Sequence, residues 1–353
     1  MSSNISNRFY LLDAARGIAA ISIVVFHFFS ANIEILSGLY VFVDFFFVLS
    51  GFVLAKSYTS KLSRVELKQY VRSRFLRLFP MPLCTILLVV LYQLALNIKH
   101  IFNPANLNET IDIKPLTILL GILMLQNFSQ SAMLLNFPLW SLSAEWFTNL
   151  IMLGVPIQRK PRLLTVVICI GIAMVMFYEF SLLEQSNFNW VSNTGRALSG
   201  FSIGILVRKN LEMKREIKGG IRLISLLSIV VVIVYYLVLV YVDSQYIFAA
   251  PIPFAFLIYA VAKLELFSSV KSQFRRLCSF LGKISFGVYV WHIPVYNTLT
   301  PMIAKAASTF NISWPRLSLI DFLLTLLISI WISVIFYRHI DPKLKLRFGL
   351  PNQ

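Results

Sequence analysis

Long apolar runs dominate the hydrophobic pattern of this 353-residue chain. Two clear examples are LLSIVVVIVYYLVLVYV, which begins at Leu226, and FLLTLLISIWISVIFY, which begins at Phe322. Each run is close to the length of about 20 residues that a helix needs to cross a bilayer. Amphipathic helices of soluble proteins do not contain such runs, because one of their faces is polar. The pattern therefore predicts an all-α polytopic membrane protein.

The apolar runs predict about ten transmembrane helices. Their approximate ranges are 9–30, 38–56, 78–97, 138–157, 163–180, 192–207, 223–242, 246–262, 284–303 and 318–337. The segment 116–126 is also apolar, but counting it as an eleventh span would place Arg159, Lys160 and Arg162 outside and reverse every later loop. We therefore interpret it as an outer re-entrant segment or an interfacial one, which a bilayer permits when protein buries the backbone.

Basic residues support this topology. With the N-terminus inside, 26 of the 32 Lys and Arg residues lie on the inner side, and Lys99, Lys114, Lys305 and Arg316 lie outside. The net charge of +17 thus follows the positive-inside rule and does not indicate nucleic-acid binding. Both termini are expected in the cytoplasm. The first apolar stretch is expected to remain as a span, because charged residues interrupt it and it lacks a cleavage site.

The composition agrees with a multi-pass protein of a cell membrane. Hydrophobic residues make up 58% of the chain and charged residues 13%, whereas soluble domains carry about 25% charged residues. The cysteines Cys84, Cys169 and Cys278 lie in or beside apolar spans without paired spacing. They predict neither a disulfide framework nor a metal site.

Ionisable groups inside the first span are the first candidates for chemistry, because such groups are costly in a bilayer unless they face a cavity or a partner. Arg16 and His27 are eleven positions apart, which places them near one helix face and about 16 Å apart along the axis. Asp13 lies three residues before Arg16, close enough to pair with it. These groups predict a polar stripe from the inner half of the membrane to the outer rim. The alternative is a structural ion pair and an interfacial histidine.

The fourth span begins with PLWSLSAEWFTNL, in which Ser141, Glu145 and Asn149 recur every four residues and share a helix face. A carboxylate about two turns below the outer surface is suited to titrate or to orient a histidine. The alternative is a packing hydrogen bond from Glu145 to another span. Asp44, in VFVDFFFVLSGF, has the same two interpretations, and Gly51 at the end of that run fits a close helix contact.

Three arginines, Arg72, Arg74 and Arg77, occur in YVRSRFLRLFP where the third span enters from the cytoplasm. They fit plain positive-inside charge, lipid phosphate binding or a site for a multiply anionic ligand. The spacing alone favours the first of these. Arginine placement at a membrane entry therefore does not identify a ligand.

Two later spans also carry polar groups. His292, in LGKISFGVYVWHIPV, is either a functional histidine or a buried neutral one that is hydrogen-bonded within the bundle. Arg196, in NTGRALSGFSIGILV, is a candidate to serve an internal cavity. Gly200 and Gly204 follow it at the spacing of small residues in packed membrane helices.

Five segments in this order resemble acyltransferase family 3, the membrane-bound acylases that include bacterial O-antigen and exopolysaccharide O-acetyltransferases. They are the Arg16 to His27 spacing, VDFFFVLSGF, RSRFLRLFP, WSLSAEW around Glu145, and LGKISFGVYVWHIPV. The resemblance covers nearly the whole chain. Many family members carry an additional soluble hydrolase-like domain, whereas here a single membrane domain over 1–353 is expected. Asp341 before Pro342 stands where members often have glutamate.

The resemblance implies transfer of an acyl group, often acetyl, from cytoplasmic acyl-CoA across the bacterial inner membrane to a hydroxyl of a cell-surface glycan. It implies that His27 is a general base or a transient acyl carrier, that Glu145 orients it, and that Arg16 steadies the donor. Arg72, Arg74 and Arg77 would hold the CoA phosphates. The supporting residues would be Asp13, Asp44, Ser141, Arg196 and His292.

The implied partners are acyl-CoA, a surface glycan or lipid-linked saccharide, and membrane lipids. Neither a permanently bound cofactor, a metal nor a nucleic acid is expected. The main alternative is a secondary transporter or flippase that uses the same buried charges, although the sequence contains no convincing internal repeat. A non-catalytic scaffold is a third possibility, and it would leave the intramembrane charges unexplained.

Overall fold

The computed structural model describes residues 8–59, 64–102, 113–157, 160–181, 189–213, 220–267, 271–310 and 314–348. Helices form all the regular structure in these ranges, as the apolar runs predicted. The chain divides into two units, and each is built from two stretches of sequence. Unit 1 comprises Met1–Ser63 and Ala144–Phe286, and unit 2 comprises Arg64–Ser143 and Gly287–Gln353.

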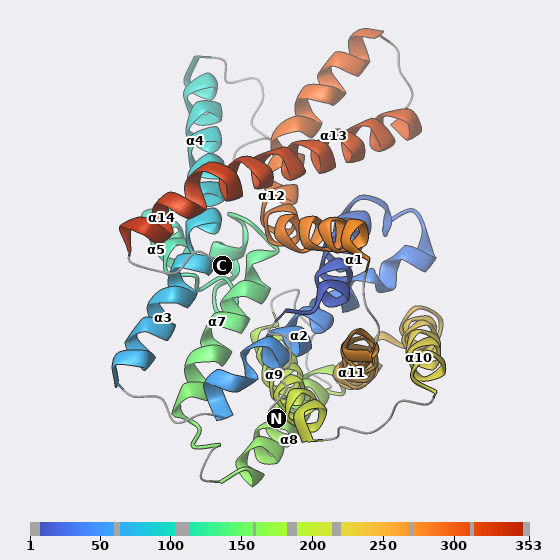
Figure 1. The fold of residues 1–353 in the computed structure, drawn as a ribbon. Helices are drawn as coiled ribbons and strands as arrows, with labels where there is room; N and C mark the ends of the chain where they lie inside the picture. The colour runs from blue at the N-terminus through green and yellow to red at the C-terminus, as the bar shows by residue number, and fades with distance from the viewer. Residues whose placement is uncertain are drawn as a thin grey trace. The chain divides into compact units, whose positions relative to one another are not determined.

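Unit 1 is a bundle of long apolar helices. They are α1 (Tyr10–Phe29), α2 (Phe42–Thr59), α8 (Arg162–Glu179), α9 (Trp190–Met213), α10 (Ile221–Tyr241) and α11 (Pro251–Phe267), as labelled in Figure 1. The 3-10 helices η1 (Glu34–Val41) and η3 (Ser244–Ala249) precede α2 and α11. Most of α7 (Leu139–Gly154) and the first part of α12 (Ser272–Phe310) also belong to this unit.

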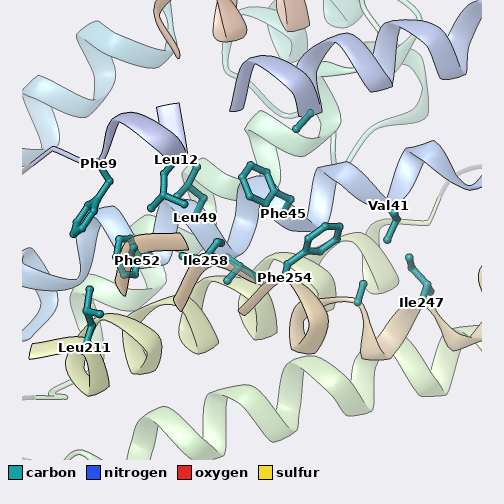
Figure 2. Packing of buried hydrophobic residues seen from close by; sticks show 14 of the residues in the cluster. Phe9, Leu12, Val41, Phe45, Leu49, Phe52, Leu211, Ile247, Phe254 and Ile258 are labelled. Atoms are coloured by element: carbon teal, nitrogen blue, oxygen red, sulfur yellow. The ribbon is translucent and has the colours of Figure 1, made fainter. Parts of the chain in front are cut away.

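The core of unit 1 combines aliphatic side chains with paired aromatic rings. Figure 2 shows Phe45 of α2 beside Phe254 of α11, and their ring centroids lie 5.7 Å apart in an edge-to-face arrangement. Phe9, just before α1, lies 5.5 Å from the ring of Phe52. Such pairs add about 0.5–1.5 kcal/mol beyond the apolar area they bury. They hold α1, α2 and α11 around one core.

Helices α2 and α9 approach each other closely through glycines. A Cβ at Gly51 would overlap the backbone carbonyl of Phe201, and a Cβ at Gly204 would overlap the carbonyl of Val48. At Gly200 the added atom would lie 2.9 Å from the Cβ of Phe47. The structure therefore confirms that these glycines serve helix packing, because no larger side chain fits between the two backbones.

Unit 2 combines three long helices with short ones. Its elements are α3 (Arg64–Leu78), α4 (Pro80–Phe102), α5 (Pro115–Ile122), α6 (Gln130–Met133), α13 (Trp314–Ile335), the π-helix η4 (Phe336–Ile340) and α14 (Asp341–Arg347). The first residues of α7 and the second part of α12 complete it. Helix α12 continues through Pro294 and Pro301.

Seven helical stretches in the described part of the chain are long and apolar enough to cross a membrane. They are Tyr10–Phe29, Glu34–Tyr58, Val65–Asn97, Arg162–Glu179, Ile221–Tyr241, Ser244–Phe267 and Leu319–Arg347. The remaining predicted spans fall in α7, α9 and α12, which carry Ser141, Glu145, Arg196 and His292. Ten spans and cytoplasmic termini thus stay predictions. Helix α7 has 16 residues and is shorter than each of the seven stretches, and polar side chains interrupt α9 and α12.

The segment 116–126 does not form a long helix. Helix α5 has eight residues and therefore rises about 12 Å, well short of the hydrocarbon thickness of about 30 Å. The chain then turns at Met124, whose φ is 57°. Its predicted position at the outer face remains a prediction.

Candidate functional site

Three charged residues cluster at the start of α1. Asp13 accepts a hydrogen bond from Arg8 Nε at 2.9 Å, and Arg16 Nη1 lies 3.7 Å from its other carboxylate oxygen. Arg8 also donates to the hydroxyl of Ser279 on α12 at 2.6 Å. The predicted Asp13–Arg16 pair is confirmed, but Arg8 is the closer partner. Sequence spacing missed Arg8 because it lies before the helix.

A carboxylate from a distant helix caps α1. Both oxygens of Glu265 on α11 accept backbone N–H groups, from Tyr10 at 2.7 Å and from Leu11 at 2.8 Å. The first N–H groups of a helix have no intrahelical acceptor, and the helix dipole favours negative charge there. Glu265 therefore fixes the helix that carries Arg16 and His27. No sequence signal pointed to it, because the pair is 255 positions apart.

His27 lies in the last turn of α1 and is half-buried. Its ring packs edge-on against Phe26, with centroids 5.0 Å apart, and Phe26 lies 6.0 Å from the ring of Tyr40 on η1. Because α1 is one continuous helix, Arg16 and His27 are separated by about 16 Å along its axis. The first span thus presents cationic and basic groups at two levels, as predicted.

Asp44 and Arg196 form a buried ion pair between α2 and α9. The guanidinium donates two hydrogen bonds to the carboxylate, Nε to Oδ1 at 3.0 Å and Nη2 to Oδ2 at 2.6 Å. Asp44 is 0% exposed and Arg196 is 7% exposed. Two donors of the Arg196 guanidinium therefore bind Asp44, and the interpretation of Arg196 as serving a cavity stays a prediction.

The aromatic ring of Tyr40 lies beside this pair. Its centroid is 5.8 Å from the Arg196 Cζ atom. The Tyr40 ring also contacts Phe26, which in turn packs against His27. One end of unit 1 therefore gathers His27, Tyr40 and the Asp44–Arg196 pair. The sequence did not indicate this arrangement, because Asp44 and Arg196 are 152 positions apart.

The polar face of α7 divides among different partners. Asn149 accepts a hydrogen bond from the hydroxyl of Tyr58 on α2 at 2.6 Å and donates to the backbone carbonyl of Glu145 at 2.7 Å. The side chain of Glu145 is half-buried. Its predicted role in orienting His27 stays a prediction. Tyr58 was missed because it follows the predicted span 38–56, where a single tyrosine carries no distinguishing signal.

In unit 2, Ser141 pairs with Tyr289 of α12. Their hydroxyl oxygens are 2.6 Å apart, and each also lies within hydrogen-bonding distance of the carbonyl of Pro138, at 3.1 and 2.9 Å. His292, one turn further along α12, is fully buried. Its Nδ1 lies 3.1 Å from the carbonyl of Val288. Since a carbonyl only accepts, Nδ1 carries the proton, and this contact agrees with the interpretation of His292 as a buried structural residue.

Asn136 supplies a hydrogen-bond donor that Pro294 cannot provide in α12. Pro294 has no N–H, so the carbonyl of Val290, four residues earlier, lacks its helical donor. Asn136 Nδ2 donates to this carbonyl at 3.0 Å and to Thr85 Oγ1 at 3.0 Å. The loop before α7 is therefore tied to α12 beside His292. Sequence reasoning missed Asn136, although Pro294 inside a predicted span was a usable signal.

The three candidate donor-binding arginines all lie on α3 in unit 2. Arg72 and Arg77 are exposed and Arg74 is half-buried. The guanidinium of Arg72 lies 5.3 Å from the ring centroid of Phe348, and that of Arg74 lies 5.8 Å from the ring of Tyr70. Contacts of this kind between a guanidinium and an aromatic ring are favourable. His27, Arg16 and Glu145 belong to unit 1.

Comparison with known proteins identifies the family. Residues 9–338 match the family described as "Acyltransferase domain", and the match extends across both units. The chain belongs to this acyltransferase family, acyltransferase family 3. Membership makes it a membrane O-acyltransferase with several apolar helices. In the described residues no group of three or more His, Cys, Asp or Glu side chains could hold a metal ion.

Two relatives of this acyltransferase show how far the similarity reaches. It is 33% identical over 194 residues to protein 2 in the picA locus of Rhizobium radiobacter, which covers 51% of this chain and 100% of that protein. It is 24% identical over 318 residues to the peptidoglycan O-acetyltransferase OatA of Listeria monocytogenes, which covers 83% of this chain. This second match spans half of the Listeria protein. No solved structure matches the acyltransferase.

Proposed function

We propose that this membrane acyltransferase moves an acyl group, most simply acetyl, from cytoplasmic acyl-CoA to a hydroxyl of a cell-surface glycan such as O-antigen or exopolysaccharide. The observation that carries the proposal is the family match over residues 9–338, which contains every motif assigned to the reaction. The Listeria relative supports it, because that protein is named for O-acetylation of peptidoglycan. The proposed location is the bacterial inner membrane, where donor and glycan lie on opposite sides.

The reaction requires a base and a route for the thioester. In the proposed mechanism, His27 removes the proton of the glycan hydroxyl while its oxygen attacks the acyl carbonyl. The carbon–sulfur bond then breaks, the CoA thiolate leaves, and it takes up a proton to give free CoA. If His27 first carries the acyl group itself, an imidazole nitrogen attacks the thioester and the carbon–sulfur bond breaks as CoA leaves. The glycan oxygen then attacks the acyl-imidazole, the carbon–nitrogen bond breaks, and the released imidazole takes up the hydroxyl proton. The half-buried position of His27 at the end of α1 supports either route.

The donor carries several phosphates, which need fixed cations. The proposal assigns them to Arg72, Arg74 and Arg77, whose planar guanidinium groups match phosphate oxygens in pairs. Arg16 would steady the donor further into the membrane. Asp13 contacts both Arg16 and Arg8, so this cluster of two cations and one anion carries a smaller net charge than the two arginines alone, which lowers its cost in the bilayer.

The test of the proposed function is mass spectrometry of the surface polysaccharide from host cells with and without the protein. The expected result is one acyl mass per glycan repeat that disappears when the gene is deleted and returns with the wild-type copy. An unchanged acylation pattern would contradict the proposal. Uptake or efflux of a glycan precursor that continues without acyl-CoA would instead support the transporter.

A further inference from the structure

Two buried amide groups in unit 2 have carbonyl oxygens without a hydrogen-bond donor. They are Gln126 Oε1 and Asn136 Oδ1, and both residues are at most 1% exposed. Both belong to residues 124–138, between α5 and α7, which we call the amide loop. A buried polar atom without a partner costs about 1–3 kcal/mol. Two such atoms in one short loop therefore need an explanation.

The orientation of the Asn136 amide is fixed by its neighbours. The carbonyl of Val290 can only accept, so the group that faces it must be Nδ2. Thr85 gives its single hydroxyl proton to the carbonyl of Pro82 at 2.8 Å, so it too must accept from Asn136. Turning the amide over would place its oxygen against an acceptor. Asn136 Oδ1 therefore points away from both partners.

The same argument fixes Gln126. Its Nε2 donates to the carbonyl of Gly121 at 3.0 Å, which leaves Oε1 on the opposite side. The two amides lie in one neighbourhood: a Cβ at Gly121 would be 2.6 Å from Leu135 Cδ1 and 3.6 Å from Ile86 Cδ1. Leu135 precedes Asn136 and Ile86 follows Thr85 along the chain. The two amides therefore lie in the same part of unit 2.

The chemistry of the two oxygens restricts the ligand. Both are neutral acceptors, so the ligand must supply neutral donors. A cation would favour carboxylates, and an anion would require N–H or O–H donors from the protein. Hydroxyl groups of a sugar meet the requirement, because each can donate one hydrogen bond. The predicted topology also places the amide loop on the outer side, where the proposed acceptor glycan lies.

We propose that the amide loop binds the acceptor glycan, whose neutral hydroxyl groups donate hydrogen bonds to Gln126 Oε1 and Asn136 Oδ1. This inference rests on the proposed function, since it names the binding site of the same acceptor. Gln126 and Asn136 are binding residues and take no part in proton transfer. Asn136 also donates a hydrogen bond to Val290 of α12, whereas Gln126 makes no such contact with α12.

Gln126 is the better position for a test. Replacing it by Met keeps the length of the side chain and removes the amide. The carbonyl of Gly121 still accepts the backbone N–H of Met124 at 3.0 Å, so it keeps a donor. A purely structural glutamine would destabilise the protein when replaced. A ligand-binding glutamine with an unpaired oxygen should leave the ligand-free protein as stable as the wild type, or more stable.

The experiment measures thermal unfolding of the full chain in nanodiscs made without sugar detergents. The probes are chitotriose and maltotriose, with glycerol at equal hydroxyl concentration as the control for solvent effects. We expect at least one trisaccharide to raise the Tm of the wild type. In Gln126→Met, loss of one hydrogen bond should weaken that binding about tenfold. Gln273→Met, at an exposed glutamine of α12 outside the amide loop, should retain the full shift.

Three results would overturn the inference. They are no Tm shift of the wild type with either trisaccharide, an equal shift in Gln126→Met, and a lower ligand-free Tm in that variant. Acylation of the host glycan, measured in parallel, separates this inference from the proposed function. Sugar binding without acylation would contradict the proposed function and support the binding site. Acylation without a sugar-dependent shift in Tm would contradict the binding site and support the proposed function.

Discussion

At the scale of single residues, His27 is the side chain on which the proposed reaction depends. We expect His27→Ala to abolish glycan acylation, because no base would remain at that position to take the hydroxyl proton. The measurement is the acyl content of surface polysaccharide in cells that carry the variant. His339→Ala, at an exposed histidine of η4, is the matched control and should keep normal acylation. Full activity of His27→Ala with normal membrane insertion would remove His27 from the mechanism.

The ion pair of Asp44 and Arg196 predicts an unequal response to single and double changes. Asp44→Asn leaves the buried guanidinium without its counter-charge, which should lower stability by about 3–5 kcal/mol. The double variant Asp44→Leu/Arg196→Met should be clearly more stable than Asp44→Asn, because neither charge remains buried. Thermal unfolding in nanodiscs gives the comparison. An equal loss of stability in both variants would show that the two charges do not stabilise each other.

Spacing along one helix was readable from the sequence, and contacts between helices were not. Asp13 and Arg16 are three positions apart, so the helical repeat alone predicted their pairing, and the structure confirms it. Arg196 and Asp44 meet only because α9 packs on α2, and nothing in either local sequence specifies the partner. Glu265 was missed for the same reason, since the donors that it accepts from are backbone N–H groups, which almost any residue supplies.

At the scale of helices, the missing N–H of Pro294 in α12 and the side-chain donor of Asn136 that replaces it can be tested together. Asn136→Leu leaves the carbonyl of Val290 without a donor and should cost about 1–3 kcal/mol. Pro294→Ala restores the helical N–H, so the double variant Asn136→Leu/Pro294→Ala should recover most of that loss. Hydrogen exchange of α12 and the Tm report the effect. A double variant as unstable as Asn136→Leu would show that the Val290 contact is unimportant.

Helix contacts were predictable where composition expresses them. The spacing of Gly200 and Gly204 indicated close packing, because small residues let two backbones approach. The structure confirms this and shows that Gly204 faces Gly51 of α2, which was also predicted to lie at a close helix contact. Asn136 belongs to a loop whose conformation is set by tertiary contacts, so no comparable pattern of residues marks its role. The unpaired oxygens of Gln126 and Asn136 became visible only with the full hydrogen-bond network.

At the scale of the whole molecule, hydrophobic runs predicted an all-helical membrane protein, and this prediction is confirmed for the described residues. The number of spans is harder to read from apolarity, because α7 is short and α9 and α12 carry polar side chains. Helix α7 has 16 residues, and Arg196 and His292 interrupt the apolar residues of α9 and α12. Length and apolarity therefore identify α1, which carries Arg16 and His27, but not the helices that carry Glu145, Arg196 and His292.

The predicted topology can be tested with alkaline phosphatase fusions, because this enzyme needs disulfide bonds and is active only outside the cytoplasm. With ten spans, fusions after Lys160 and Lys218 should be inactive, and a fusion after Ser186 should be active. If the segment 116–126 spanned the bilayer, all three signs would reverse. The short length of α5 favours the first pattern, and that pattern places the amide loop on the same side as Ser186. Activity after Lys160 would move the loop to the cytoplasmic side, away from the glycan that we propose it binds.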